Sequence, residues 1–247
     1  MKSVCAVILA AGRGSRMKSD LPKVLHTIHG KPLIVFPLQT LQSLGIPQTI
    51  TVVKHQADLV LPVVIKYSQI AYQGEEYGTA KAVEAALPIV HKKIDTIMVV
   101  NGDDSMFYEA KTFRSVIKQH TTEQNAITFI TLLKEDPSKY GRIVYDKNGK
   151  FKKIVEEKDA TVKQRKIKEV NDGVYLFDKQ FLLDNIKKLK PSKVTGEYYL
   201  TDLINIATKQ GKQVGTYLLR DNTEFFGIST QDDVQQANQY YSSAKQI

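Results

Sequence analysis

The stretch that decides the fold reads Leu9-Ala10-Ala11-Gly12-Arg13-Gly14-Ser15-Arg16-Met17, and Leu21-Pro22-Lys23 follows it. The apolar run before it, residues 4–9, predicts a buried strand, so the glycines lie where a parallel strand turns towards the next helix. Gly12 and Gly14 permit backbone conformations that other residues avoid, and they let main-chain N–H groups approach an anion closely. Arg16 and Lys23 bring two positive charges to the same loop. The segment therefore predicts a loop that holds a phosphate-rich ligand, such as a nucleoside triphosphate.

Length and composition predict one domain. The chain has 247 residues, 42% of them hydrophobic, which is enough for one substantial core but too few for two full domains. Its apolar runs are far shorter than the roughly 20 residues of a membrane span, and no signal-peptide pattern precedes the first strand. We therefore expect a soluble, cytoplasmic protein. Cys5 is the only cysteine, so an internal disulfide and a thiolate zinc cluster are excluded, and we expect its side chain to be buried.

The formal net charge is +9, but the basic residues are scattered along the chain. The densest patch comprises Lys163, Arg165, Lys166 and Lys168. Lysine-rich surfaces are usually solvated faces, and we favour that interpretation over phosphate steering or nucleic-acid binding. We therefore do not expect nucleic acid as a partner.

Apolar runs alternate with amphipathic segments in the first half of the chain. Strands are predicted at residues 4–9, 49–53, 96–100 and 126–133. Helical spacing is present at residues 32–44 and 79–90, and Pro32 suits the first turn of a helix. This alternation predicts an α/β fold: a mostly parallel, Rossmann-like sheet with helices on both faces.

The pattern changes after Asp136-Pro137. Residues 142–145 and 151–155 flank Asp146-Lys147-Asn148-Gly149, a strong hairpin signal, so an insertion at 136–168 is predicted to form a small β-hairpin lid. The later elements are predicted as a strand at 170–177, a helix at 199–209, a strand at 214–219 and a polar helix at 232–245. We expect one domain at 1–229 and a C-terminal helical arm at 230–247.

Polar residues that directly follow a strand are the candidates for a site, because ligands of open α/β sheets bind beyond the carboxyl ends of the strands. Asn101-Gly102-Asp103-Asp104 follows the run 97–100. A carboxylate there is well placed to hold Mg²⁺, which prefers oxygen ligands and bridges to phosphates. Spacing alone does not say which aspartate binds the metal, and a capping role in a turn is the alternative.

Two further segments begin predicted helices. In residues 72–79, Gln73 offers a donor and an acceptor to a base edge, and the main chain at Gly78 can approach a ring. Thr79 next to it is a nucleotide contact or only a helix cap. Residues 196–202 suit contacts with sugar hydroxyls or, again, capping. The five histidines show no metal-ligand spacing, and we expect His26 and His29 on the surface.

Two common nucleotide-binding motifs do not fit. Met17 occupies the third glycine position of a dinucleotide-binding loop, and the second strand is followed by Lys54-His55 rather than by an acidic residue for a ribose. A P-loop is excluded because no Gly-Lys-Ser/Thr follows Gly12 at the required spacing.

Five segments carry a resemblance to a known family. They are LAAGRGSRMKSDLPKVLH, YGTAKAV, NGDD, the long stretch at residues 140–178 and GEYYLTDLI. Together they resemble the N-terminal uridylyltransferase domain of the bifunctional N-acetylglucosamine-1-phosphate uridylyltransferase/glucosamine-1-phosphate acetyltransferase family. The first segment is shared by many sugar nucleotidyltransferases, whereas residues 140–178 are far more particular to this family. The resemblance covers residues 4 to about 228.

The resemblance implies a role for each matched residue. Arg16 and Lys23 would bind the triphosphate as catalytic residues together with Asp103, which would coordinate Mg²⁺. The nucleotide would contact Leu9, Ala10, Ala11, Gly12, Gly14, Lys23, Gln73, Gly78 and Thr79. The sugar phosphate would contact Gly141, Glu156, Asn171 and Thr201.

The sequence departs from the family pattern in three ways. Ser105 stands where the family usually has a proline, and Ser229 stands where it places a second metal-ligating asparagine. A hydroxyl is a weaker Mg²⁺ ligand than an amide carbonyl. The acetyltransferase β-helix is missing from this sequence, so acetyl transfer and the trimer that the β-helix builds are not predicted.

The predicted reaction is UTP plus N-acetylglucosamine 1-phosphate giving UDP-N-acetylglucosamine and pyrophosphate, a step towards cell wall precursors. Two alternatives stay open: another sugar 1-phosphate, such as glucose 1-phosphate, or a non-catalytic nucleotide-sugar sensor. The oligomeric state is left open by the sequence.

Overall fold

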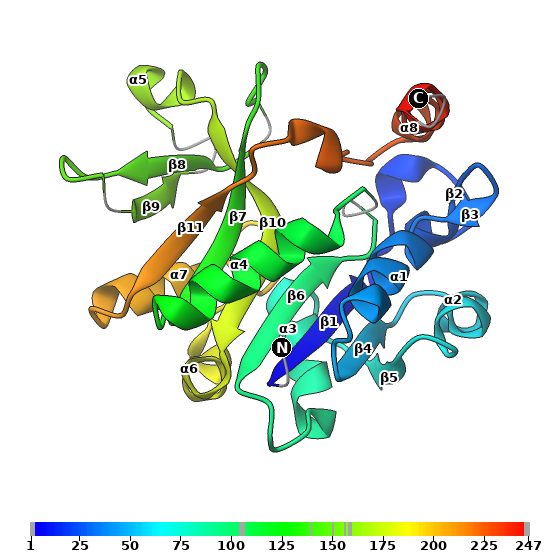
Figure 1. The fold of residues 1–247 in the computed structure, drawn as a ribbon, viewed down its shortest axis with the longest axis horizontal. Helices are drawn as coiled ribbons and strands as arrows, with labels where there is room; N and C mark the ends of the chain where they lie inside the picture. The colour runs from blue at the N-terminus through cyan, green and yellow to red at the C-terminus, as the bar shows by residue number, and fades with distance from the viewer. Residues whose placement is uncertain are drawn as a thin grey trace.

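The computed structural model describes residues 3–103, 107–138, 140–149, 151–155, 157 and 160–244. A nine-stranded sheet forms the centre of the molecule (Figure 1). Its main path runs β11-β7-β10-β6-β1-β4-β5, and along it only β10 is antiparallel to its neighbours. The strands of this path are β1 (Val4–Ala10), β4 (Gln48–Val53), β5 (Gln69–Tyr72), β6 (Thr96–Asn101), β7 (Ile127–Leu133), β10 (Glu169–Asp178) and β11 (Val214–Leu218). The predicted α/β fold with a mostly parallel sheet is confirmed.

Alternating side chains of β1 enter two different cores, one on each face of the sheet. Cys5 and Val7 pack with α3 (Thr79–Ala86), α6 (Lys179–Asn185) and α7 (Asp202–Lys209). Ala6 and Ile8 pack on the opposite face with α1 (Val35–Ser43), α2 (Ala57–Val64) and α4 (Ala110–Thr122). A strand buried on both faces reads as a continuous apolar run, which is why residues 4–9 show no polar alternation.

Most predicted elements lie within one or two residues of their observed bounds, but two helix starts are wrong. Pro32 belongs to the short strand β3 (Lys31–Pro32), which pairs with β2 (Thr27–Ile28), and α1 begins only at Val35. The helix predicted at 199–209 begins at Asp202. Cys5 is buried as expected, and burial raises the pKa of its thiol to about 12.

The predicted hairpin consists of β8 (Arg142–Tyr145) and β9 (Phe151–Val155). It joins the main sheet through one pairing, Arg142 with Val170 of β10, and projects from the β7 and β10 side of the sheet in Figure 1. The short helix α5 (Val162–Arg165) follows, with a capping box formed by Thr161 and Gln164. The domain limits at 136–168 and 229/230 stay predictions.

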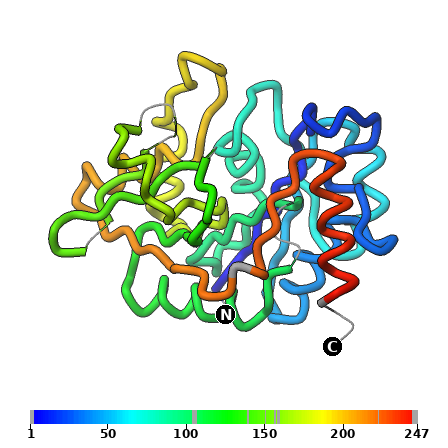
Figure 2. Tube along the Cα trace, turned by 90° about the horizontal axis from the view of Figure 1, so that it is seen from above, coloured from blue at the N-terminus to red at the C-terminus, as the bar shows by residue number. Residues whose placement is uncertain are grey.

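The C-terminal arm is the helix α8 (Gln231–Ala244), and it lies alongside the N-terminal part of the chain, as the view from above shows (Figure 2). An aromatic cluster holds it there, with Tyr241 close to both Phe36 of α1 and Phe107. His29 bonds to Asn238 and Ser242 of the helix. The arm is therefore packed onto the β2–β3 hairpin next to the glycine loop.

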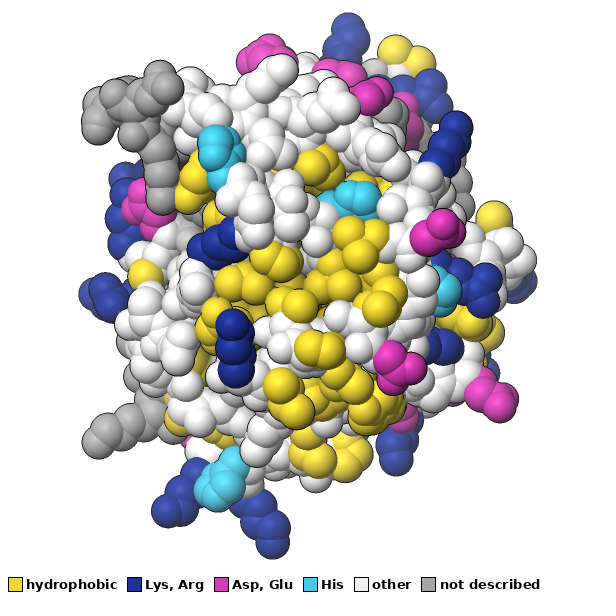
Figure 3. Space-filling view, turned by 90° about the vertical axis from the view of Figure 1, so that its right-hand side faces the viewer, with side chains coloured by type: hydrophobic (Ala, Val, Ile, Leu, Met, Phe, Trp, Pro, Cys, Tyr) yellow, Lys and Arg dark blue, Asp and Glu magenta, His cyan; other side chains and the backbone are white. Residues whose placement is uncertain are grey.

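Strand β5 is one edge of the sheet, and the surface beside it is apolar. Leu59 and Ile65, in and directly after α2, are 48% and 65% exposed. Hydrophobic side chains gather on this side of the molecule (Figure 3). Among the described residues, no helix is both long and apolar enough to traverse a bilayer.

Candidate active site

Two adjoining clefts open where β1, β5 and β6 end and β10 begins. The first has a volume of about 570 Å³ and is lined by Leu9, Ala11, Gly12, Arg13, Gly14, Ser15, Gln73, Tyr77, Gly78, Thr79, Ala82, Asn101, Asp103, Thr195, Gly196 and Glu197. The second, of about 800 Å³, is lined by Leu9, Thr79, Asn101, Glu157, Arg165, Gly173, Tyr175, Ser192, Tyr199, Leu200, Thr201 and Asp202. Leu9, Thr79 and Asn101 line both, so two ligands bound side by side would meet there. A third hollow, of about 620 Å³, lies at the opposite ends of the strands and includes Asp95 and Gln213.

The glycine loop follows β1 as predicted. Gly14 has a φ of +60°, and a Cβ at this position would lie 2.8 Å from Cβ of Lys23, so the loop requires glycine here. Gly12 has open space around it and lines the first cleft. Arg16 lies in the 3₁₀ turn Ser15–Met17 and is exposed. The loop thus offers main-chain groups to the cleft, with Arg16 at its far end.

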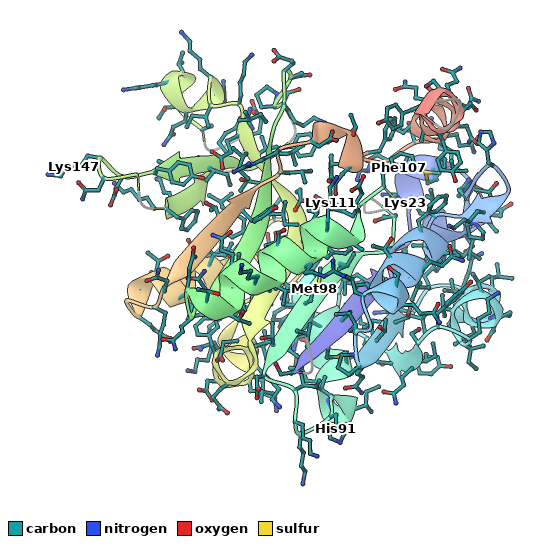
Figure 4. All side chains as sticks on the ribbon, in the orientation of Figure 1. Lys23, His91, Met98, Phe107, Lys111 and Lys147 are labelled. Atoms are coloured by element: carbon teal, nitrogen blue, oxygen red, sulfur yellow. The ribbon has the colours of Figure 1, made fainter. Side chains whose placement is uncertain are left out.

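Lys23 and Asp103 are in direct contact. Asp103 follows Gly102, whose N–H donates to the carbonyl of Leu9 (3.0 Å) and fixes the turn after β6 against β1. Lys23 Nζ lies 2.6 Å from Asp103 Oδ2, and both side chains are mostly buried, 12% and 21% exposed. In Figure 4, Lys23 lies at the end of the sheet near α8, whereas His91 lies at the opposite end. The residues Asp104 and Ser105 lie outside the described part of the chain.

Main-chain bonds join the loop before α3 to the segment before α7. Gly78 has a φ of +113°, and a Cβ there would lie 2.3 Å from the carbonyl oxygen of Tyr198. The N–H of Tyr198 donates to Tyr77, and that of Ala80 donates to Tyr198 (both 3.0 Å). Thr79 Oγ1 accepts from the N–H of Leu200 and is not a helix cap. The two segments therefore form one wall between the clefts.

The amide group of Gln73 shapes this loop. Its Nε2 donates to the carbonyl of Glu76 (2.8 Å) and, more weakly, to that of Gly78 (3.5 Å). Gln73 lines the first cleft, and its contact with a base stays a prediction.

Of the predicted sugar-phosphate residues that the structure describes, Thr201 lines the second cleft, whereas Gly141 and Asn171 are not among its lining residues. The hydroxyl of Thr201 does not cap α7. Burial raises the pKa of the neighbouring Asp202 above its usual value. The N–H of Asn171 donates to the carbonyl of Gly141, and Asn171 Nδ2 donates to Tyr175 Oη, while its buried Oδ1 has no partner among the described residues.

Glu156 lies outside the described residues, but Glu157 is placed. Its carboxylate pairs with Arg142, whose side chain is fully buried, and lies 3.5 Å from Nε of Arg165. The base of the hairpin thus forms one side of the second cleft.

Ser229 lies at the start of α8, close to the Lys23 side of the site. The N–H groups of Ser229 and Thr230 both donate to Asp233 Oδ2 (2.8 Å each). Burial alone would raise the pKa of Asp233, but these bonds and the charge of Lys23 hold it below its usual value. Gln231 Nε2 donates to the carbonyl of Met17, so α8 is tied directly to the glycine loop.

Arg13, Tyr77 and Lys54 were missed by the sequence analysis. Arg13 Nη2 donates to Tyr77 Oη (2.9 Å) across the mouth of the first cleft, and Lys54 Nζ lies 3.6 Å from the ring centroid of Tyr77. The only signal in the sequence is the aromatic residue Tyr77 between Glu76 and Gly78 in a glycine-bounded loop. Of the two histidines expected on the surface, His29 is exposed, whereas His26 is half-buried and its Nε2 is buried.

A comparison with models of known protein families identifies the family of this chain. The model described as nucleotidyl transferase matches residues 5–247. The chain belongs to this family. It is accordingly a nucleotidyltransferase, as the motifs predicted.

Curated relatives of this nucleotidyltransferase include the bifunctional protein GlmU of Streptococcus suis, 38% identical over 229 residues. The bifunctional protein GlmU of Bacillus cereus is 39% identical over 237 residues. These alignments cover 93% and 96% of the chain but 50% and 51% of the relatives, so the chain spans about half their length. The predicted resemblance to one half of a bifunctional protein is confirmed.

A solved structure supports the fold. It is titled a putative glucose-1-phosphate thymidylyltransferase from Bacillus anthracis in complex with a sucrose, and it superposes with a TM-score of 0.78 at 23% identity. The match covers 96% of this chain and 94% of that one.

Proposed function

We propose that this nucleotidyltransferase transfers the uridylyl group of UTP to N-acetylglucosamine 1-phosphate and releases pyrophosphate. One observation carries the proposal: the two clefts share Leu9, Thr79 and Asn101, with the glycine loop and Asp103 on one side and Thr201 on the other. A nucleotide in the first cleft and a sugar phosphate in the second would meet at this boundary. The choice of uracil and N-acetylglucosamine comes from the family resemblance of the sequence motifs, which the similarity to the GlmU relatives supports.

The residues around Asp103 fit the magnesium ion that the family resemblance implies. Mg²⁺ in nucleotide sites needs only one or two protein carboxylates, since substrate phosphates and water complete its shell. The carboxylate of Asp103 is mostly buried and already faces a cation, Lys23, so this point of the cleft favours positive charge. Asp103 and Ser229 would hold the ion, which when bound supplies positive charge that neutralises phosphate oxygens.

The chain's own residues align the reactants and neutralise charge. A sugar phosphate is anionic at neutral pH, so its oxygen attacks the α-phosphorus of UTP without a general base. The bond between the α-phosphorus and the oxygen that bridges to the β-phosphorus breaks, and pyrophosphate leaves with that oxygen. Arg16 and Lys23 stabilise the charge that develops on the departing pyrophosphate. Gln73, Gly78 and Thr79 bind the uracil, and the main chain at residues 9–14 holds the nucleotide in line. Gly141, Glu156, Asn171 and Thr201 position the sugar phosphate.

A substrate panel tests the proposal. UTP, dTTP, ATP, CTP and GTP are each combined with N-acetylglucosamine 1-phosphate, glucosamine 1-phosphate or glucose 1-phosphate, with and without Mg²⁺, and pyrophosphate is measured. We expect the highest kcat/KM for UTP with N-acetylglucosamine 1-phosphate, and Asp103→Asn should remove nearly all activity. A higher kcat/KM for another pair would replace the proposed substrates, and UTP binding without turnover would indicate a sensor.

A further inference from the structure

The mouth of the first cleft is crossed by a contact between two exposed side chains that are 64 positions apart in the sequence. Arg13 Nη2 donates to Tyr77 Oη (2.9 Å), and the Arg13 guanidinium carbon lies 5.4 Å from the centroid of the Tyr77 ring. Both residues line the cleft together with Gln73, Gly78 and Thr79. The contact therefore bridges the glycine loop and the loop that is expected to bind the base.

The Tyr77 side of this bridge is firmly held. Lys54 Nζ donates to the carbonyls of Glu75 (2.8 Å) and Glu76 (3.3 Å), which fixes the loop against the end of β4. The carbonyl of Tyr77 accepts from the N–H of Tyr198, and Glu76 Oε2 pairs with Lys81 at 2.7 Å. Bonds from three different segments thus hold the main chain around Tyr77 at the rim of the cleft, and Lys54 also lies over its ring.

The Arg13 side chain is restrained much less than Tyr77. Arg13 stands between Gly12 and Gly14, and a Cβ at Gly12 would have open space around it. Its side chain is exposed, and an exposed contact between a cation and an aromatic ring is weak. A phosphate oxygen is a far stronger partner for a guanidinium, since that bond joins opposite charges in a bidentate geometry.

The geometry points to Arg13 as a third cation for the triphosphate and to Tyr77 as a fixed surface for the nucleoside. When a nucleoside triphosphate enters the first cleft, Arg13 exchanges the hydroxyl of Tyr77 for a phosphate oxygen, and the Tyr77 ring packs against the nucleoside. This inference rests on the proposed function, because it assumes that the first cleft takes a nucleotide. It adds two binding residues to those that the family resemblance implies.

Two probes separate the two roles. Inorganic tripolyphosphate carries the charge of the triphosphate without a nucleoside, whereas UTP carries both. With the full chain and isothermal titration calorimetry, we expect Arg13→Met to weaken the binding of both probes by roughly tenfold, the loss of one charged contact. Tyr77→Ala should weaken UTP binding by a similar factor and leave tripolyphosphate binding within twofold. Lys66→Met is the matched control, because Lys66 lies over Tyr67 in a similar contact away from the cleft, and it should change neither affinity.

The results also separate this inference from the proposed function. If the wild-type chain binds UTP but Arg13→Met binds tripolyphosphate normally, or if Tyr77→Ala weakens both probes equally, the inference is wrong and the proposed function stands. If the wild-type chain binds another nucleoside triphosphate instead of UTP, the proposed substrate is wrong, and the same two variants tested with that nucleotide decide the inference. If no nucleoside triphosphate binds, both are wrong.

An optical measurement gives an independent readout. The chain has no tryptophan, so Tyr77→Trp places a single indole on the rim of the cleft. Its emission should change on addition of UTP as the nucleoside covers the ring. An emission spectrum that is the same with and without saturating UTP would overturn the role of Tyr77.

Discussion

Lys23 Nζ lies 2.6 Å from Asp103 Oδ2, so the lysine expected to bind phosphate is paired with the carboxylate expected to bind metal. Both side chains are mostly shielded from water, which strengthens the attraction relative to a surface pair. A divalent cation at Asp103 would compete with Lys23 for the carboxylate, and displacement would release Lys23 towards the triphosphate. The pair would therefore couple the proposed metal binding to the proposed phosphate binding.

Replacing Lys23 by methionine tests this coupling. Lys23→Met removes the competing cation, so the affinity for Mn²⁺ without nucleotide should rise by roughly tenfold, measured by electron paramagnetic resonance. Pyrophosphate release should fall by roughly 10²- to 10³-fold, since a charge that stabilises the leaving group is lost. Lys168→Met is the control, because it breaks an exposed pair with Glu135 and should change neither value. Unchanged Mn²⁺ affinity in Lys23→Met would contradict the competition.

The position of Ser229 predicts a weak metal site that one substitution improves. An amide carbonyl is a better Mg²⁺ ligand than a hydroxyl, so Ser229→Asn should lower the Mg²⁺ concentration for half-maximal rate by several-fold. The N–H group of Ser229 still bonds to Asp233 in this variant, so the start of α8 is preserved. Ser243→Asn, near the other end of the helix, serves as the control. The same Mg²⁺ requirement in Ser229→Asn and in the wild type would show that residue 229 does not contact the metal.

Gly78 is expected to be irreplaceable for steric reasons. In Gly78→Ala the new Cβ would meet the main chain of Tyr198 at 2.3 Å in a left-handed conformation, so the wall between the clefts must deform. The free energy of unfolding should fall by about 3 kcal/mol, measured by urea denaturation. Gly74→Ala, in the same loop but with open space around it, should stay within about 0.5 kcal/mol of the wild type. Equal stability of the two variants would contradict the close approach.

His120 makes the stability of the fold depend on pH. It is 3% exposed, with Nδ1 bonded to Thr128 Oγ1, and burial lowers its pKa to about 4, partly offset by Asp178 and Glu123. In the unfolded chain His120 has a pKa near 6.5 and binds a proton more tightly than in the folded protein. The stability that depends on a neutral His120 is therefore fully present above pH 6.5 and is lost as the pH falls towards 4. When the pH is lowered from 6.5 to 5, the free energy of unfolding should fall by roughly 1.5 kcal/mol because of His120. His120→Gln keeps a polar group but cannot titrate, so its stability should fall less over this range, and an equal fall in both proteins would exclude His120 as the cause.

Local chemistry explains what could be predicted of this molecule. The buried strands before the glycine loop and before Asp103 read as apolar runs, and the turn at 146–149 identified the hairpin. By contrast, α2 was not predicted, because nearly all of its residues are apolar and Pro62, a residue that usually breaks helices, lies inside it. Pro32 suits a helix start and equally a short edge strand, so its local preference gave the wrong element.

The site was predictable where one segment carries the chemistry and not where two segments meet. The glycine loop, Asp103 and Thr201 follow recognisable local patterns, and all lie at the clefts. The contact of Arg13 with Tyr77 depends on how β1 and β5 lie relative to each other, which no local pattern encodes.

A crystal structure with a non-hydrolysable UTP analogue tests the central claim most directly. We expect the triphosphate along residues 12–16, with Lys23 and Arg13 turned towards it, and the uracil against Gln73, Gly78 and Thr79. A nucleotide bound instead in the cleft around Thr201 and Asp202, or in the hollow that includes Asp95 at the opposite ends of the strands, would contradict this expectation.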